Sequence, residues 1–243
     1  MKPFLSIVLP AHNEAERLPE TLEKIDRFLK LQPYTAEVVI VENGSDDETL
    51  ALAQGYAQRF PYLKVIHEKQ RGKGLAVRRG MLEATGQYRF ICDADLSMPI
   101  EEVNRFLPPI LPDTAIAIAS REAPGAKRYG EPEYRHLVGR VFNGLVRFMA
   151  LPGLQDTQCG FKCFREDTIW LFDCQTIEGW TFDVELLFAA RRNGLTIVEV
   201  PIPWYFNPHS KVHLVRDSIQ MGLDLFKIRL NALRGQYKHH CRA

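Results

Sequence analysis

Short apolar runs alternate with helical segments through the first hundred residues, and this alternation constrains the fold most. The runs are Phe4–Leu9, Val38–Val41, Leu63–Ile66 and Tyr88–Cys92. Their short length and their β-branched and aromatic content are typical of buried strands. Between the first two runs, apolar residues recur at the spacing of one helix face, at Leu18, Leu22, Ile25, Phe28 and Leu29. Strands and helices that alternate in this way predict a parallel sheet covered on both faces.

The second half of the chain is less regular. Strand-like runs lie at Ala115–Ala119, Ile197–Val200 and Ile202–Tyr205, and amphipathic helices are predicted at about Tyr134–Met149 and Leu214–Leu233. Residues 122–132 are rich in Pro, Gly and charge, which predicts a mobile loop. We therefore expect an α/β fold with a mixed, mostly parallel sheet and helices on both faces, in one domain over residues 1–243.

Two carboxylates, Asp93 and Asp95, follow directly after the strand-like run that ends at Cys92. Ligands of open α/β sheets lie at the carboxyl ends of the strands. Neighbouring carboxylates there repel each other unless a cation lies between them, and their hard oxygens suit Mg²⁺ or Mn²⁺. The alternative is that one aspartate caps a helix that begins near Pro99.

Other polar residues fall in the loops after the first two predicted strands. Because parallel strands end at the same edge of a sheet, these residues and the two aspartates are expected to share one mouth. They are Asn13, Glu14, Glu42, Asn43 and Ser45. A polar mouth on an apolar scaffold predicts a ligand site.

Composition excludes several classes of function. The formal net charge of +1 gives no attraction to nucleic acid. Cys159 and Cys163 have no matching Cys or His pair at zinc spacing. No apolar run approaches the roughly 20 residues of a membrane helix, and the start has no signal-peptide pattern. We expect a cytoplasmic protein. A dehydrogenase is disfavoured, because no Gly-rich G-x-G-x-x-G turn follows the first strand.

Six motifs in order are similar to those of one enzyme family. They are P-A-x-N-E (Pro10–Glu14), V-E-N-G-S-x-D (Val41–Asp47), R-G-K-G-x-A-V-R-x-G (Arg71–Gly80), D-A-D-L-S (Asp93–Ser97), S-R (Ser120–Arg121) and D-T-Q-C-G-F-K (Asp156–Lys162). The chain resembles family 2 glycosyltransferases of the GT-A fold. Among them it is most similar to the polyprenyl-phosphate sugar synthases, which include the dolichyl-phosphate glucosyltransferases and mannose synthases, and the last motif favours the glucose enzymes.

Two motifs depart from the family pattern. The usual D-D-G-S after the second strand reads Glu42-Asn43-Gly44-Ser45 here. The helix pattern R-x-x-x-S-x-x-x-N reads Arg135, Gly139, Asn143, so one hydroxyl is missing.

The resemblance implies a nucleotide-sugar donor, with UDP-glucose favoured and GDP-mannose as an alternative. It implies a donor-binding half over residues 1–120, an acceptor-binding half over residues 121–235 and a tail over residues 236–243. Asp93 and Asp95 would hold Mg²⁺ or Mn²⁺, which screens the diphosphate as it leaves. The residues implied to bind the nucleotide sugar are Pro10, Ala11, Asn13, Glu14, Glu42, Asn43, Lys73, Asp93, Asp156, Gln158 and Lys211.

The implied acceptor is a dolichyl or polyprenyl phosphate. A monoester phosphate has a second pKa of about 6, so near neutral pH it is largely a dianion that needs cations more than a base. Arg121 and Arg135 would bind it, because a guanidinium binds phosphate bidentately. The implied catalytic set is Asp95, Arg121, Arg135 and Asp183, and inversion would give a β-linked product.

Three questions stay open at this stage. A hydroxyl acceptor, as in polysaccharide or glycolipid synthesis, would need Asp183 or Glu185 as a base. A non-catalytic nucleotide-sugar-binding protein is a further alternative. The apolar faces of the helices at 134–149 and 214–233 suggest peripheral contact with the cytoplasmic membrane face, a homodimer contact, or a separate membrane-protein partner.

Overall fold

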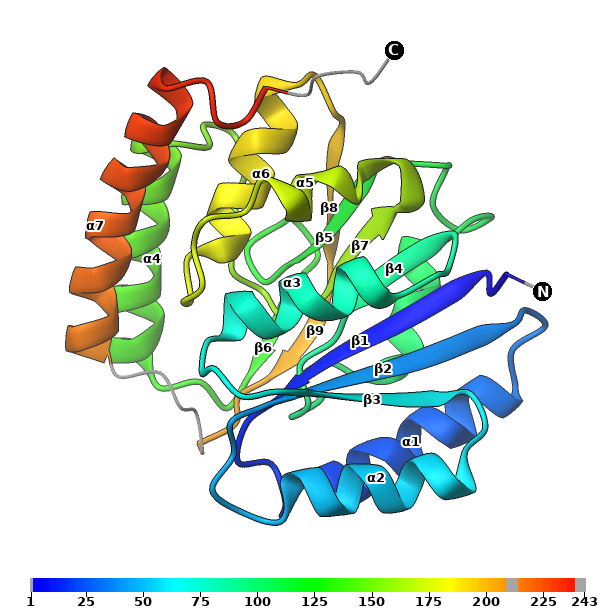
Figure 1. Ribbon diagram of the computed structural model, residues 1–243. Coiled ribbons are helices and arrows are strands. Elements are labelled where there is room, and N and C mark those ends of the chain that lie inside the picture. The colour runs from blue at the N-terminus through cyan, green and yellow to red at the C-terminus, as the bar shows by residue number, and fades with distance from the viewer. Residues whose placement is uncertain (1, 209–213, 239–243) are drawn as a thin grey trace.

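A seven-stranded sheet with helices on both faces forms the centre of the protein (Figure 1). The computed structural model describes residues 2–208 and 214–238. The strand order is β3-β2-β1-β4-β7-β5-β8. Helices α1 (Leu18–Lys30) and α2 (Thr49–Arg59) cover one face, and α3 (Lys73–Glu83), α5 (Trp170–Asp173) and α6 (Phe182–Arg192) cover the other (Figure 1). The predicted α/β fold with a mixed, mostly parallel sheet is confirmed.

The first four strands are parallel, as the sequence predicts. They are β1 (Leu5–Ala11), β2 (Ala36–Asn43), β3 (Leu63–Glu68) and β4 (Tyr88–Ile91), and Leu5 pairs with both Ala36 and Tyr88. Alternate β1 residues face opposite cores: Ile7 packs with α1, and Val8 packs with α3. Burial on both faces explains why β1, β2 and β4 are largely apolar runs, whereas the edge strand β3 buries only Leu63.

The sheet changes direction at β7 (Lys162–Arg165), which the sequence did not predict. This strand is antiparallel to both β4 and β5 (Ile116–Ser120), and β8 (Ile197–Pro201) then runs parallel to β5. The segment K-C-F-R carries charges at both ends, so it lacks the pattern of a buried strand. Lys162 is nevertheless buried.

The prediction of a mobile loop over residues 122–132 was wrong. This segment contains β6 (Lys127–Tyr129), which pairs in parallel with β9 (Pro203–Tyr205) to form a second, small sheet. Glu122 holds the region together, because its carboxylate accepts hydrogen bonds from Arg128 and Arg140. The predicted final strand Ile202–Tyr205 therefore belongs to this small sheet.

Helices α4 (Glu133–Met149) and α7 (Leu214–Leu233) lie side by side at the edge of the molecule (Figure 1). Both match their predicted ranges closely. The segment after Pro99 forms a 3-10 helix, η1 (Ile100–Phe106), and no side chain caps it, so neither aspartate acts as its cap. A second short 3-10 helix, η2 (Glu166–Thr168), follows β7. No helix in the described ranges is long and apolar enough to span a membrane.

Candidate active site

A cleft of about 760 Å³ opens where β1, β2 and β4 end, and α4, α6 and α7 contribute to its walls. The structure brings most of the predicted site residues together there. Those that line the cleft are Pro10, Asn13, Glu14, Asn43, Lys73, Asp93, Asp95, Arg121, Arg135, Gln158 and Asp183. Residues from both predicted halves of the chain therefore share one cleft.

Three of the predicted nucleotide-sugar-binding residues that the structure describes do not line it. Ala11 is buried in β1, and Glu42 and Asp156 are buried behind residues of the cleft wall. Lys211 lies outside the described residues. Sequence spacing places a residue near an edge of the sheet, but it does not show which neighbour covers that residue.

The Asp93 carboxylate has a lysine ammonium group beside it. Lys73, the first residue of α3, places its ammonium 2.7 Å from Asp93 Oδ1. Burial would lower the pKa of Lys73, but the nearby carboxylates of Asp93, Asp183 and Asp95 outweigh burial and raise it. Gly160 faces the same carboxylate, and a Cβ at that position would overlap it. Asp93, the first aspartate of the D-A-D-L-S motif, thus lies against a glycine and a charged lysine.

Asp95 is turned into the cleft by a local turn. Its Oδ1 accepts a hydrogen bond from the backbone N–H of Ser97 at 3.0 Å. Leu96 between them adopts a φ of +42°, which is uncommon for a residue with a side chain and occurs often at functional sites. No group of three or more His, Cys, Asp or Glu residues that could hold a metal occurs within residues 2–208 and 214–238. Two carboxylates alone suit an ion that takes its other ligands from a diphosphate and water.

The N-terminus of α3 is occupied by backbone. The carbonyl oxygen of Glu178 accepts hydrogen bonds from the backbone N–H groups of Gly74 and Leu75, at 2.8 and 3.3 Å. A helix N-terminus often binds phosphate, but these two donors are already used. The positive charge at this end of the cleft therefore comes from the side chain of Lys73.

Arg121 and Asp156 form a buried, bidentate ion pair. The Arg121 Nε and Nη2 donate to the two carboxylate oxygens at 2.6 and 3.0 Å, and the Arg121 backbone N–H adds a third bond. Burial raises the pKa of Asp156, but the guanidinium outweighs burial and brings it down to about 2. Glu199 in turn accepts from the backbone N–H of Asp156 at 2.9 Å. Two of the donors of Arg121 are thus committed within the protein.

Arg135 is different. It projects from the first turn of α4 into the cleft, and its guanidinium carbon lies 5.3 Å from the ring centre of Phe206. Within residues 2–208 and 214–238 no carboxylate pairs with it, and its buried Nε has no hydrogen-bond partner. A buried donor without a partner is costly, so it indicates a place for a ligand anion.

Asp183 and Glu185 separate as helical geometry requires. Asp183 lines the cleft, and Lys162 Nζ donates to its Oδ2 at 3.2 Å. Burial raises the pKa of Asp183, although Lys162 and Lys73 oppose the shift. Glu185 is 1% exposed and accepts hydrogen bonds from Thr176, Ile177 and Tyr237. It does not line the cleft, so of the two residues only Asp183 reaches a ligand.

The loop after β2 is built around Glu42. Its two carboxylate oxygens lie 2.6 Å from the Ser45 backbone nitrogen and 2.6 Å from His67 Nδ1. Burial raises the pKa of Glu42, but these hydrogen bonds lower it overall. The Ser45 hydroxyl then accepts from the backbone N–H of Asn13 at 2.9 Å. Glu42 thus shapes the mouth without lining it.

Sequence reasoning missed three aromatic residues and one lysine at the site. Trp180, Trp204 and Phe206 line the cleft, and Lys162 supports Asp183 from below. Lys73 lies 5.2 Å from the Trp180 ring centre, and Arg121 lies 5.4 Å from that of Trp204. The available signal was the presence of aromatic residues beside Gly and Pro in loops of the second half.

Comparison with known proteins decides the family. The family model described as Glycosyl transferase family 2 matches residues 6–171. The chain belongs to glycosyl transferase family 2. A human dolichyl-phosphate beta-glucosyltransferase is 36% identical over 250 residues, covering 96% of this chain and 77% of that protein. The protein of the same name from Saccharomyces cerevisiae is 35% identical over 257 residues, covering 97% and 77%.

Solved structures confirm the GT-A fold of this glycosyltransferase. Mannosyl-3-phosphoglycerate synthase from Rubrobacter xylanophilus superposes with a TM-score of 0.70 at 18% identity, covering 99% of this chain and 77% of that one. Glucosyl-3-phosphoglycerate synthase from Mycobacterium tuberculosis, solved with Mn²⁺, UDP-glucose and phosphoglyceric acid, gives a TM-score of 0.64 at 19% identity, covering 96% and 80%. At these identities the likeness establishes the fold alone.

Proposed function

We propose that this glycosyltransferase transfers glucose from UDP-glucose to a dolichyl or polyprenyl phosphate, with inversion. The names of its relatives support the glucosyl donor and the lipid-phosphate acceptor. One observation carries the proposal: the Arg135 guanidinium points into the cleft, and its buried Nε has no hydrogen-bond partner among the described residues. Arg135 lies near one end of a surface of exposed apolar residues.

A phosphate acceptor fits Arg135 better than a hydroxyl does. A hydroxyl is neutral and would leave the guanidinium without a counter-charge, whereas a phosphate accepts two parallel N–H hydrogen bonds from it. Near neutral pH the acceptor phosphate is already largely ionised, so its oxygen can attack without a base. Arg121 assists through whichever N–H groups its pairing with Asp156 leaves available.

A divalent cation would bind at Asp93 and Asp95. When bound, it supplies Lewis-acid stabilisation of the leaving diphosphate. Asp93 has Oδ2 available besides the oxygen that contacts Lys73, and Asp95 has Oδ2 besides the oxygen bonded to Ser97. Mg²⁺ and Mn²⁺ both accept such a set, with water and diphosphate oxygens completing the shell.

The donor would lie along the strand ends. Its nucleoside would contact Pro10, Asn13, Glu14 and Asn43, which line the β1–β2 side of the cleft. The ammonium of Lys73 is near enough to the two aspartates to stabilise the diphosphate. Asp183 and Gln158 then lie on the side where the hexose would extend.

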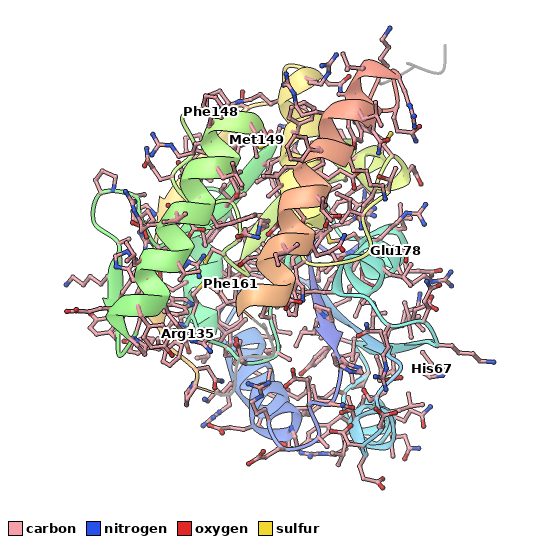
Figure 2. All side chains as sticks on the ribbon, turned by 90° about the vertical axis from the view of Figure 1, so that its left-hand side faces the viewer. His67, Arg135, Phe148, Met149, Phe161 and Glu178 are labelled. Atoms are coloured by element: carbon pink, nitrogen blue, oxygen red, sulfur yellow. The ribbon has the colours of Figure 1, made fainter. Side chains whose placement is uncertain are left out.

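The lipid would approach along α4 and α7. Both helices expose large apolar side chains on the same edge of the molecule: Leu137, Val138, Val141, Leu145 and Phe148 on α4, and Ile219, Leu223, Phe226, Leu230 and Leu233 on α7. We call these ten residues the apolar surface. Figure 2 shows the two helices alongside each other, with Arg135 near one end of α4 and Phe148 near the other.

Contiguous exposed apolar area of this kind marks a membrane or protein contact. Arg135 and Phe148 are 13 residues apart, or about 20 Å along the helix, so a phosphate on Arg135 would leave its lipid chain beside apolar side chains. The apolar surface supports a proposed peripheral position at the cytoplasmic membrane face. A homodimer through the same surface is the competing arrangement.

The test is transfer of radiolabelled sugar from UDP-glucose and, in parallel, from GDP-mannose to a polyprenyl phosphate in detergent, with Mn²⁺ or Mg²⁺. We expect a lipid-phosphate glucose product from UDP-glucose that disappears with EDTA. Product formed from GDP-mannose alone would identify GDP-mannose, and not UDP-glucose, as the donor. Absence of product from either donor, with nucleotide bound to folded protein, would overturn the proposal and favour a hydroxyl acceptor.

A further inference from the structure

Residues 174–181 connect α5 to α6 and form one wall of the cleft; we call them the strap. The strap holds Glu178, whose carbonyl accepts from the first N–H groups of α3, and Trp180, whose ring lines the cleft. None of the six sequence motifs includes it.

The strap is fixed from beneath by the buried Glu185. One Glu185 oxygen accepts from the backbone N–H groups of Thr176 and Ile177, at 2.9 and 2.8 Å. The other accepts from the hydroxyls of Thr176 and Tyr237, at 2.6 and 2.7 Å. Three hydrogen bonds from the strap, and a fourth from Tyr237, thus converge on one buried carboxylate and fix this irregular segment.

Gln175 adds a tie to α3. Its side-chain amide donates to the carbonyl oxygens of Gly74 and Ile177, at 2.9 and 2.8 Å. Gly74 is needed there, because a Cβ would lie 2.6 Å from the Ile177 carbonyl oxygen and 2.7 Å from Phe182 Cβ. Contacts to Glu185 on one side of the strap and to Gly74 of α3 on the other therefore fix the segment that leads to Trp180.

Trp180 lies beside the charged group of Lys73 in the cleft. The Lys73 ammonium is 5.2 Å from its ring centre and 2.7 Å from Asp93. Asp183 follows three residues later, at the start of α6, and lines the same cleft. The Trp180 ring is only partly buried, whereas tryptophan side chains are highly buried on average.

We propose that Trp180 is the contact surface for the donor hexose, and so a specificity-determining residue of the transfer. This inference rests on the proposed function. The diphosphate would lie at Asp93, Asp95 and Lys73, and the nucleoside at the ends of β1 and β2. The hexose then extends to the opposite side of the diphosphate, where Trp180 and Asp183 form the wall. The electron-rich face of an indole attracts the polarised C–H bonds of a pyranose ring, as it attracts the edge of another aromatic ring.

The experiment is calorimetric titration of the whole chain with UDP-glucose and with UDP, each with MnCl₂. It compares wild type, Trp180→Ala, Trp180→Phe and the control Trp170→Phe, which replaces a tryptophan of α5 that does not line the cleft. We expect Trp180→Ala to weaken UDP-glucose binding by about two- to tenfold and to leave UDP binding unchanged. Trp180→Phe retains an aromatic face and should recover most of the loss.

Four results would overturn the inference. Equal weakening of UDP-glucose and UDP would assign the ring to the nucleotide, and unchanged binding of both would remove it from the donor site. Failure of Trp180→Phe to recover any binding would indicate a purely structural role. A wild-type chain that binds UDP but not UDP-glucose would overturn the proposed donor as well, whereas binding by wild type with no effect of Trp180→Ala overturns this inference alone.

Discussion

The donor side and the acceptor side of the cleft satisfy their charges differently. On the donor side, charged groups already have partners within the protein, as in Lys73–Asp93 and Lys162–Asp183. On the acceptor side, Arg135 has no such partner among the described residues, and the apolar surface beside it is exposed. Charged groups that pair within the protein keep a site in a preorganised shape. A charged group without a protein partner indicates the charge of the ligand that binds there.

The largest expected effect tests the donor side at its metal ligand. Asp95→Ala should lower glucosyl transfer by about a hundredfold or more, because the cation that stabilises the leaving diphosphate loses a ligand. Steady-state transfer at saturating UDP-glucose measures it. The control is Asp173→Ala, which removes an exposed carboxylate outside the cleft. Equal activity in wild type and Asp95→Ala would contradict the metal assignment.

The next effect concerns stability. Asp156→Asn should lower the free energy of unfolding by about 2–4 kcal/mol at pH 7, because it leaves the Arg121 guanidinium without its buried counter-charge. The pKa of Asp156 is about 2 in the fold, below its ordinary 3.8. A depressed carboxylate pKa stabilises the fold fully above pH 4, and the stabilisation is lost as pH falls toward 2. The difference between wild type and variant should shrink in that range.

Urea unfolding at several pH values measures the effect, and Asp167→Asn is the matched control. Asp167 pairs with Arg165, but its side chain is 57% exposed, so its loss should cost less than about 1 kcal/mol. Similar losses in the two variants would show that the Arg121–Asp156 pair adds no more than a surface ion pair.

A smaller effect tests the role of the apolar surface on the acceptor side. Phe148→Ser combined with Phe226→Ser should weaken binding to vesicles containing polyprenyl phosphate by about tenfold, or about 1.4 kcal/mol in total, since two partly inserted phenylalanines contribute only a fraction of the roughly 1.5–3 kcal/mol that each gives on full burial. Phe148 is 90% exposed, so the fold should keep its stability. Leu31→Ser is the control, because Leu31 is 82% exposed and follows α1, away from the apolar surface. Unchanged vesicle binding with loss of a dimer in sedimentation would assign the surface to a homodimer.

The smallest effect separates a phosphate acceptor from a hydroxyl acceptor. Asp183→Asn should lower transfer to polyprenyl phosphate by less than about tenfold, whereas loss of a general base costs about 10²–10⁴-fold. The residual loss comes from Lys162, which keeps its position but loses a charged partner. Abolished transfer to the phosphate acceptor would establish a base and contradict the reasoning from an ionised phosphate.

The sequence predicted the donor side better than the acceptor side for a physical reason. Strands β1, β2 and β4 are buried on both faces, so their apolar runs and the polar residues that follow them are visible in the sequence. The strand β7 was missed because its first residue is Lys162, a charged residue that is buried with two partners, the Cys159 carbonyl and Asp183, 21 residues later. Pairing across that separation leaves no periodic signal.

The same limit applies to the arginines. Arg121 and Arg135 were predicted to act alike on the acceptor phosphate, because a guanidinium binds phosphate bidentately. In the structure both arginines line the cleft, but Arg121 pairs with a carboxylate, whereas Arg135 pairs with none among the described residues. Trp180 was not singled out at all, because the strap that positions it has no regular secondary structure and is held by Glu185 from the next helix.

The most direct test of the account is the dependence of transfer on polyprenyl phosphate concentration in wild type and Arg135→Gln. We expect kcat/KM for the acceptor to fall by about 10- to 100-fold, because a charge-assisted pair of hydrogen bonds to phosphate is lost. The KM for UDP-glucose and the free energy of unfolding should be unchanged. An unchanged acceptor kcat/KM in a folded Arg135→Gln variant would contradict the claim that the open guanidinium binds the acceptor phosphate.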